Sequence, residues 1–287
     1  MFSSAAGVLF DGFAYGMLLF LLSVGLSVTL GMMNFVNLAH CSFAMVGGYA
    51  TVSLTGKLGW PFLATLPAAF LAGAAVSIVL ERTLYRKLYR ASDLDQCLLT
   101  IGIVFISVAA LAWFYSTEQQ SVRVPDYLQG SVQVGAQSFA AYRLFLIAIG
   151  LLILGALVFL VERTRFGAQV RAAVDNQRMA RGLGIDVDRA FMITFALGGG
   201  LAGLGGALAI QVVGLDPTFA LAYLVYVLIV VAVGGLGSIG GSFAAAAVLG
   251  ISDMAGKYYF PWLGAFLIYL VMVALLMWRP AGLFGKR

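Results

Sequence analysis

Long apolar stretches separated by short polar segments run along the whole chain. A membrane-spanning helix needs about 20 predominantly apolar residues to cross roughly 30 Å of hydrocarbon. Two shorter stretches, Ser42–Leu54 and Phe243–Met254, are read as tilted spans, halves of broken helices or re-entrant segments. The pattern predicts an all-α, polytopic transmembrane helical bundle of about 8–9 membrane segments, with interrupted or re-entrant segments among them. The seven clear spans are Leu9–Met32, Trp60–Leu80, Leu98–Tyr115, Leu144–Val161, Ala190–Val213, Phe219–Val233 and Trp262–Trp278.

The composition supports a membrane protein. Hydrophobic residues make up 62% of the chain and charged residues 10%, whereas soluble domains are usually about 45–50% apolar and about 25% charged. The 35 glycines suit helices that pack closely in lipid. Cys41 and Cys97 lie in or beside apolar segments, so we expect buried thiols and no disulfide. The first residues lack the basic region of a cleaved signal peptide, and we expect one transmembrane domain over residues 1–287.

Basic residues gather in three segments. Residues 81–96, 162–189 and 279–287 hold thirteen of the 17 lysines and arginines. Alternating spans place all three segments on one face, which the positive-inside rule makes cytoplasmic. The C-terminus is therefore expected to be cytoplasmic, whereas the side of the N-terminus depends on whether Ser42–Leu54 crosses.

Residues 116–142 form the one sizeable loop expected outside. Alternating polar and apolar residues at 131–134, after a turn at Gly130, suggest a small hairpin. An irregular loop is the alternative.

The longest charged run is residues 162–189. Gly167 is expected to break the chain, and residues 168–181 are rich in good helix formers and contain no proline. Gly182 and Gly184 are expected to end that helix, and Asp186 can cap the next one. The run therefore predicts a short helix outside the bilayer. It is either a solvated loop that only sets topology or a docking element for a soluble partner.

A polar break interrupts the apolar pattern at residues 31–42. Asn34, Asn37 and His40 recur every three residues, so they would share one face of a helical turn. Together with Ser42 they are candidates for lining a substrate pathway, because polar groups at membrane depth must face protein or water. The main alternative is that they cap helix ends and bond freed backbone groups. His40 has no second ligand at metal-binding spacing, so no metal site is predicted.

A second break, GGLGSIGG, covers residues 234–241. It lacks the Lys and Ser/Thr of a phosphate-binding loop, so no nucleotide site is predicted. Its glycines permit an unwound or tightly packed backbone, and Gly234, Gly235, Gly237 and Ser238 join the pathway candidates.

The two breaks lie in segments with a similar pattern. Leu22–Ala50 and Val230–Gly250 each read as an apolar span, a break and a short apolar segment. Paired interrupted segments point to a transport site near the midplane, with chance similarity as the alternative. Asp253, near the end of the second short segment, is expected to reach the external interface, with a position facing a cavity as the alternative.

Small residues line one expected span at four-residue spacing. A doubled small-xxx-small face of this kind predicts close helix–helix contact. The packing residues are Gly198, Gly199, Ala202, Gly203 and Gly206.

The sequence shows no paired carboxylates at helical spacing in a span and no series of acids crossing the bilayer, which weakens the case for an enzyme or a proton-driven pump.

Taken in order, several segments resemble the permease subunits of branched-chain amino-acid ABC importers, specifically the shorter of the two permease types. The resemblance covers nearly the whole chain, and the combination is far more specific than any one piece. The segment around NFVNLAH is similar to that family's N-[FLM]-A-H-G signature. The matching segments are Gly25–His40, Arg171–Arg189, Thr194–Leu197, Gly234–Ile239 and Arg279–Gly285.

This resemblance implies a permease whose cytoplasmic coupling loop, residues 162–189, docks on an ATPase. It implies two cytoplasmic ATPase subunits that bind ATP and Mg, a second and usually different permease, and a periplasmic solute-binding protein. It also implies the bacterial inner membrane, with no cofactor in this chain and no nucleic-acid partner. The coupling residues would be Arg171, Asp175, Ala180, Gly182, Gly184, Ile185 and Asp186.

Three positions depart from the family pattern. Cys41 replaces the usual Gly, Gly240 a common Pro, and Tyr226 a frequent Lys. They leave the cargo open between branched-chain or related small amino acids and urea or another small amide. A channel or secondary transporter that works without an ATPase is the alternative from a different class.

Overall fold

The computed structural model describes residues 2–33, 35, 37–89, 91–134 and 137–285, and most of them are helical. One antiparallel hairpin joins strands β1 (Ser131–Val134) and β2 (Gln137–Ala140). The short helices are η1, a π-helical turn (Glu81–Tyr85), α4 (Arg86–Leu88), α6 (Asp126–Gln129), α8 (Arg165–Asp175) and α9 (Gln177–Gly182). The longer helices are α1 (Phe2–Met33), α2 (His40–Leu58), α3 (Phe62–Leu80), α5 (Asp93–Tyr115), α7 (Ala141–Arg163), α10 (Val187–Val213), α11 (Phe219–Gly234), α12 (Ile239–Tyr259) and α13 (Gly264–Trp278).

Several of these helices can cross a membrane. Within the described residues, six segments are long and apolar enough to do so. The predicted polytopic helical bundle is therefore confirmed, while the number of 8–9 segments stays a prediction. The two short stretches, Ser42–Leu54 and Phe243–Met254, lie within the continuous helices α2 and α12. The six segments are Ala5–Gly31, Phe62–Leu88, Asp93–Tyr115, Ala141–Arg163, Val187–Val213 and Ile239–Tyr259, and Phe219–Gly234 and Phe266–Trp278 are shorter apolar helices.

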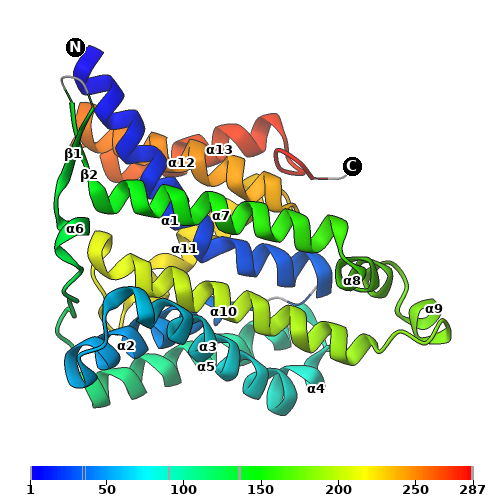
Figure 1. Ribbon diagram of the computed structural model, residues 1–287. Helices are drawn as coiled ribbons and strands as arrows, with labels where there is room; N and C mark the ends of the chain where they lie inside the picture. The colour runs from blue at the N-terminus through cyan, green and yellow to red at the C-terminus, as the bar shows by residue number, and fades with distance from the viewer. Residues whose placement is uncertain (1, 34, 36, 90, 135–136, 286–287) are drawn as a thin grey trace.

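The helices form a centre and a periphery. In the most apolar 18-residue stretch of each helix, the buried share is 89% in α1 and 78% in α10. In α5 and α7 it is only 11% and 17%. The peripheral helices thus turn apolar side chains outward, as a bundle surrounded by lipid requires. The long helices run roughly along one axis, with α1 and α10 between the others (Figure 1).

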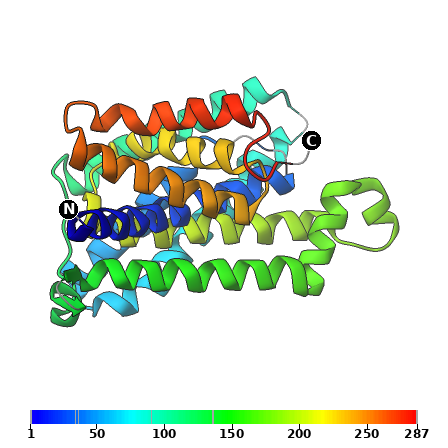
Figure 2. The same cartoon turned by 90° about the horizontal axis from the view of Figure 1, so that it is seen from above.

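The two ends of the bundle differ in character. One end, here called the hairpin end, carries β1, β2 and α6, and the other, here called the basic end, carries α4, α8, α9 and residues 279–285 (Figures 1 and 2). The predicted hairpin is confirmed, with Ser131 paired to Ala140 and Val134 to Gln137. The three basic segments therefore lie at the same end, as alternating spans predict.

Glycine lets α10 contact its neighbours backbone to backbone. In four contacts, a Cβ atom added to one glycine would lie only 1.9–2.3 Å from a carbonyl oxygen of the facing helix. Ala202, on the same helix, is fully buried. The small residues of α10 thus face three helices, α1, α2 and α3. The four contacting pairs are Gly25–Gly198, Gly73–Gly199, Gly47–Gly203 and Ala44–Gly206.

Replacing one of these glycines should destabilise the protein. In Gly206→Ala the new methyl group would lie 1.9 Å from the carbonyl oxygen of Ala44. The two helices would have to move apart, because a backbone atom cannot move out of the way as the end of a side chain can. We expect the free energy of unfolding to fall by about 1–3 kcal/mol. Gly155→Ala in α7 is the control, because nothing lies within 4 Å of its added Cβ, and alanine there should stabilise by up to about 1 kcal/mol. Thermal unfolding of the purified variants in detergent measures both, and equal melting temperatures would contradict the packing argument.

Candidate functional site

The loop between α7 and α10 begins with a capped helix. The hydroxyl oxygen of Thr164 accepts a hydrogen bond from the backbone N–H of Gly167 (3.2 Å), so α8 begins at Arg165. The expected break at Gly167 is therefore wrong. Gly167 instead packs against the end of α7, where an added Cβ would lie 2.2 Å from the carbonyl oxygen of Val161.

The predicted helix over residues 168–181 is divided in two. Asn176 leaves the helical conformation (φ −154°), and its side-chain oxygen accepts a hydrogen bond from the N–H of Met179 (3.0 Å), which caps α9. Asparagine bonds its own backbone in this way outside helices, which explains the division. The helix end and the helix cap expected for the rest of the loop are confirmed. α9 ends at Gly182, Gly184 is left-handed (φ +82°), and Asp186 caps α10 by accepting from the N–H of Arg189 (3.0 Å).

A small apolar core of its own holds the loop together. Ala173 of α8, Ala180 of α9, and Val187 and Phe191 of α10 are buried against one another, with Ile185 half-buried beside them. Of the predicted coupling residues, Ala180 and Ile185 therefore face inward and position the loop. The exposed ones are Arg171, Asp175, Gly182, Gly184 and Asp186.

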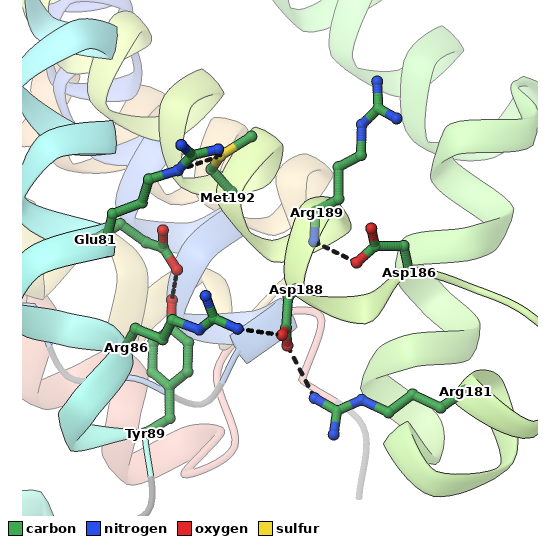
Figure 3. A network of polar contacts seen from close by, with 9 residues as sticks. Glu81, Arg86, Tyr89, Arg181, Asp186, Asp188, Arg189 and Met192 are labelled. Carbon is green, nitrogen blue, oxygen red and sulfur yellow. Dashed lines mark hydrogen bonds and ion pairs between the residues drawn. The ribbon is translucent and has the colours of Figure 1, made fainter.

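Ion pairs tie the loop to the neighbouring helix ends (Figure 3). Asp188 of α10 accepts from Arg86 of α4 (2.5 Å) and from Arg181 of α9 (2.9 Å). These side chains are about half exposed, so each pair contributes at most about 1 kcal/mol. Nearby, the Tyr89 hydroxyl donates to Glu81 (2.8 Å), and burial together with this bond raises the pKa of Tyr89. The network fixes how α9 sits relative to α4 and α10.

Two apolar side chains stand out on the projecting part of the loop. Met179 is 63% exposed and Leu183 is 78% exposed, and α8 and α9 extend beyond the rest of the bundle (Figure 2). Exposed apolar groups on a charged, well-packed projection are typical of a protein-binding surface. Sequence reasoning missed both residues, although their spacing of four within a charged run was the available signal.

The first break is only partly described, because Asn34 lies outside the described residues. Asn37 is buried, and its side-chain oxygen accepts from the N–H of Ala39 (3.1 Å) and from the hydroxyl of Tyr85 (3.4 Å). Asn37 precedes α2 instead of lying on it, so the expected helical face shared with His40 is wrong. The cause is again an asparagine side chain that bonds local backbone.

His40 and Ser42 lie in the first turn of α2 and link it to other helices. His40 Nε2 is hydrogen-bonded to the carbonyl of Leu22 on α1 (3.1 Å), and the Ser42 and Ser107 hydroxyls lie 2.8 Å apart. Both side chains are buried within the chain. In this conformation both side chains bond groups of other helices, α1 and α5, and α2 has no side-chain cap.

The two breaks meet in space. A Cβ atom added to Gly31 would lie 1.9 Å from the Cα of Gly237. Gly235 (φ +95°) and Gly237 (φ +78°) adopt the left-handed backbone that favours glycine, and Ser238 caps α12 by accepting from the N–H of Gly241 (3.0 Å). The break between α11 and α12 therefore folds back against the end of α1.

A cavity at the basic end brings the predicted sites together. It has a volume of about 870 Å³ and is lined by both breaks and by α8. Gly31, Gly237 and Ser238 come from the breaks, and Arg171 and Asp175 come from the loop. Two of the predicted pathway residues thus share a cavity with two of the predicted coupling residues, whereas Asn37 and His40 are not among those that line it.

Residues 279–285 complete the end of α11. The N–H of Leu283 donates to the carbonyl of Val233 (2.7 Å), and that of Phe284 donates to the carbonyl of Gly234 (3.2 Å). Carbonyls in the last turn of a helix lack partners within it, so this segment acts as a cap supplied from far along the chain. The left-handed turn at Gly282 (φ +83°) brings it there.

Asp253 does not reach the interface as expected. Asp253 is only 1% exposed, because its side chain points from α12 toward the neighbouring helices.

Fold and site together define a multi-pass membrane protein. A structured loop projects from its basic end, and two glycine-containing breaks between helices lie next to that loop. The chain matches the family described as branched-chain amino acid transport system / permease component over residues 8–276, and it belongs to that family. As a permease component it is a transport subunit and not an enzyme.

Curated relatives cover nearly the same length. The chain is 27% identical over 283 residues to the probable branched-chain amino acid transport permease protein LivH of Methanocaldococcus jannaschii, covering 94% of this chain and 90% of the relative. It is 24% identical to the permease LivH of Escherichia coli K12, covering 97% and 94%. It is also 25% identical to the permease LivM of that strain, covering 93% of this chain and 68% of the relative. No solved structure matches the chain.

Replacing Gly282 should detach the capping segment. Alanine would have to adopt φ +83°, at a cost of about 1–2 kcal/mol, and its Cβ would lie 2.6 Å from the backbone of Gly235. We expect the amide hydrogens of Leu283 and Phe284 to exchange faster, as measured by hydrogen–deuterium exchange. Gly240→Ala is the control, since its added Cβ meets nothing within 4 Å. Unchanged protection in Gly282→Ala would show that the cap is not held by these contacts.

Proposed function

We propose that this chain is the membrane-spanning permease subunit of an ATP-driven importer for branched-chain or related small amino acids. The family and the names of the relatives support the cargo class. The observation that carries the mechanism is the self-packed projection at the basic end, with Met179 and Leu183 exposed.

The projection is well built to dock on a cytoplasmic ATPase. Its own apolar core and the ion pairs of Asp188 keep it ordered, so a partner does not have to order it on binding. Buried anchors surrounded by charged groups are the usual content of a tight protein interface. In this proposal two ATPase subunits bind ATP and Mg, and their closure pulls the coupling loop, residues 162–189.

The partners and the orientation follow from the same reading. The positive-inside rule places the basic end, and with it the C-terminus, in the cytoplasm of a bacterial inner membrane. LivH and LivM of one strain both match this chain, which supports a second permease as its partner. A periplasmic binding protein would deliver the solute to the hairpin end.

The nine longer helices give a nine-segment topology with the start of α1 outside. α2 begins beside the middle of α1, where His40 bonds the carbonyl of Leu22, and residues 37–39 belong to the interruption that precedes α2. Movement of α8 would reach the breaks through the cavity that Arg171 and Asp175 share with Gly237 and Ser238. We assign the pathway to both breaks: Asn34, Asn37, His40, Ser42, Gly234, Gly235, Gly237 and Ser238.

Removing the exposed apolar groups should weaken ATPase docking. In the double variant Met179→Ser with Leu183→Ser, each lost anchor costs more than about 1 kcal/mol of binding, so affinity should fall at least about tenfold. The folded permease should persist, because both side chains are exposed. Co-purification with the co-expressed ATPase subunits and ATP-dependent leucine uptake in proteoliposomes measure the effect.

Leu94→Ser is the matched control for that experiment. Leu94 is 67% exposed at the start of α5, at the same end of the bundle but outside the loop. Its replacement should leave docking intact. Unimpaired docking in the double variant would overturn the proposed docking surface. Full uptake by the permease without any ATPase would overturn the importer mechanism in favour of a channel or secondary transporter.

The cargo can be tested by competition. In proteoliposomes that contain the complete importer with its binding protein, a hundredfold excess of unlabelled isoleucine or valine should suppress radiolabelled leucine uptake. The same excess of urea should not, if the cargo is an amino acid. Suppression by urea but not by isoleucine or valine would indicate that the cargo is a small amide.

A further inference from the structure

Asp253 is a buried carboxylate within a membrane-spanning helix. It is 1% exposed, and its Oδ2 lies 2.6 Å from Nζ of Lys257. Among the described residues, no donor reaches its other oxygen, Oδ1, which is itself buried. Leaving a buried acceptor without a partner costs stability, and costs more when the group is charged. An ionisable residue inside a membrane segment is therefore a candidate for function.

Lys257 supplies the opposite charge one helical turn away. Its side chain is 52% exposed, and Nζ lies 5.4 Å from the ring centre of Tyr15. An ammonium group has three N–H donors, and Asp253 takes one of them. The pair thus places a buried, unpartnered carboxylate oxygen next to an ammonium group on a half-exposed side chain.

Tyrosines surround the pair. The Tyr15 ring of α1 faces the Lys257 ammonium group, and Tyr223 and Tyr226 belong to α11, which packs against α12. The rings of Tyr223 and Tyr226 are 5.7 Å apart, and Tyr269 of α13 continues the row at 6.3 Å. Aromatic faces attract ammonium groups and also pack well against aliphatic side chains.

The cluster lies near the hairpin end, away from the coupling loop. α12 runs toward that end and finishes at Tyr259 (Figure 1). Tyr258, Tyr259, Phe260 and Trp262 are 50–77% exposed, as in an aromatic belt at a membrane surface. Asp253 lies five residues before the first of these, about 7.5 Å deeper along the helix.

We propose that Asp253 and Lys257 form a binding site for a zwitterionic α-amino acid. Asp253 Oδ1 accepts hydrogen bonds from the ammonium group, Lys257 binds the carboxylate, and the tyrosine row receives the side chain. A purely structural pair would need only Oδ2 and would leave Oδ1 unpaired at a cost. A metal site does not fit, since the described residues contain no group of three His, Cys, Asp or Glu that could hold an ion.

This site deepens the proposed function and rests on it. In the proposed orientation the hairpin end is the one at which a delivered solute arrives, so the site would receive amino acids before they pass the two breaks. It also gives a reason for selecting amino acids over neutral amides such as urea, which carry neither charge.

Binding of three ligands to the full chain in lipid nanodiscs tests the proposal. Leucine has both charges, 4-methylpentanoate lacks the ammonium group, and 3-methylbutylamine lacks the carboxylate. We expect saturable leucine binding by isothermal titration calorimetry, weakened at least about tenfold by either deletion, because a hydrogen bond to a charged group contributes about 1.5–3 kcal/mol. The absence of leucine binding, or equal binding of all three ligands, would overturn the site.

Variants assign the two charges. Asp253→Asn, which keeps the side-chain volume, should weaken leucine at least about tenfold without affecting 4-methylpentanoate. Lys257→Met should bring leucine down to the affinity of 3-methylbutylamine. Ser252→Ala is the control, because Ser252 is half-exposed and its hydroxyl bonds only the Val248 carbonyl. Wild-type leucine affinity in Asp253→Asn would overturn the proposal.

Two further readouts separate failure of the site from failure of the proposed function. If Asp253→Asn does not fold, the ligand series on the natural chain and Lys257→Met still decide the site. ATPase-dependent uptake without leucine binding by the chain would remove the site and leave the function. Leucine binding with no ATPase docking would keep the site and remove the proposed ATP-driven function.

Discussion

Contact between the backbone of α10 and the backbones of α1, α2 and α3 holds the centre of this bundle together. In lipid, helices gain little from hiding apolar surface, because the surrounding chains are as apolar as leucine. Attraction must come from close packing, and close packing of two backbones requires that no side chain stand between them. Glycine meets that requirement at the four contacts, and an added methyl group would meet a carbonyl oxygen at 1.9–2.3 Å in each.

The loop between α7 and α10, residues 162–189, takes its position from the same helix. α10 begins at Val187, directly after the Asp186 cap, and its first turns supply Val187 and Phe191 to the core of the loop. Asp188 then links that turn to α4 and α9. A force applied to α9 therefore acts on a rigid central helix and not on a flexible linker. Because α10 cannot slide past its neighbours without breaking backbone contacts, we expect such a force to move a group of helices together.

Patterns local in the sequence predicted local features well. Apolar runs gave the helices, alternation at 131–134 gave the hairpin, and Asp186 gave a helix cap. Failures arose where a side chain or a distant segment decided the outcome. Asn176 divides a helix by bonding its own backbone. Residues 279–285 complete the end of α11 about fifty residues earlier, a pairing that no periodicity reveals. The inward orientation of Asp253 depends on which helices surround α12, which one chain position cannot indicate.

The central place of α1 has a consequence for how the protein enters the membrane. α1 is made before the helices that bury it, so it must first reside among lipid tails without them. Two of its polar groups are already satisfied within the helix: the Ser23 hydroxyl donates to the Phe20 carbonyl, and that of Thr29 donates to the carbonyl of Gly25. Asp11 near the start of α1, by contrast, pairs with Arg143 of α7. The central helix therefore gains the partner of its one charged residue only after α7 has been synthesised.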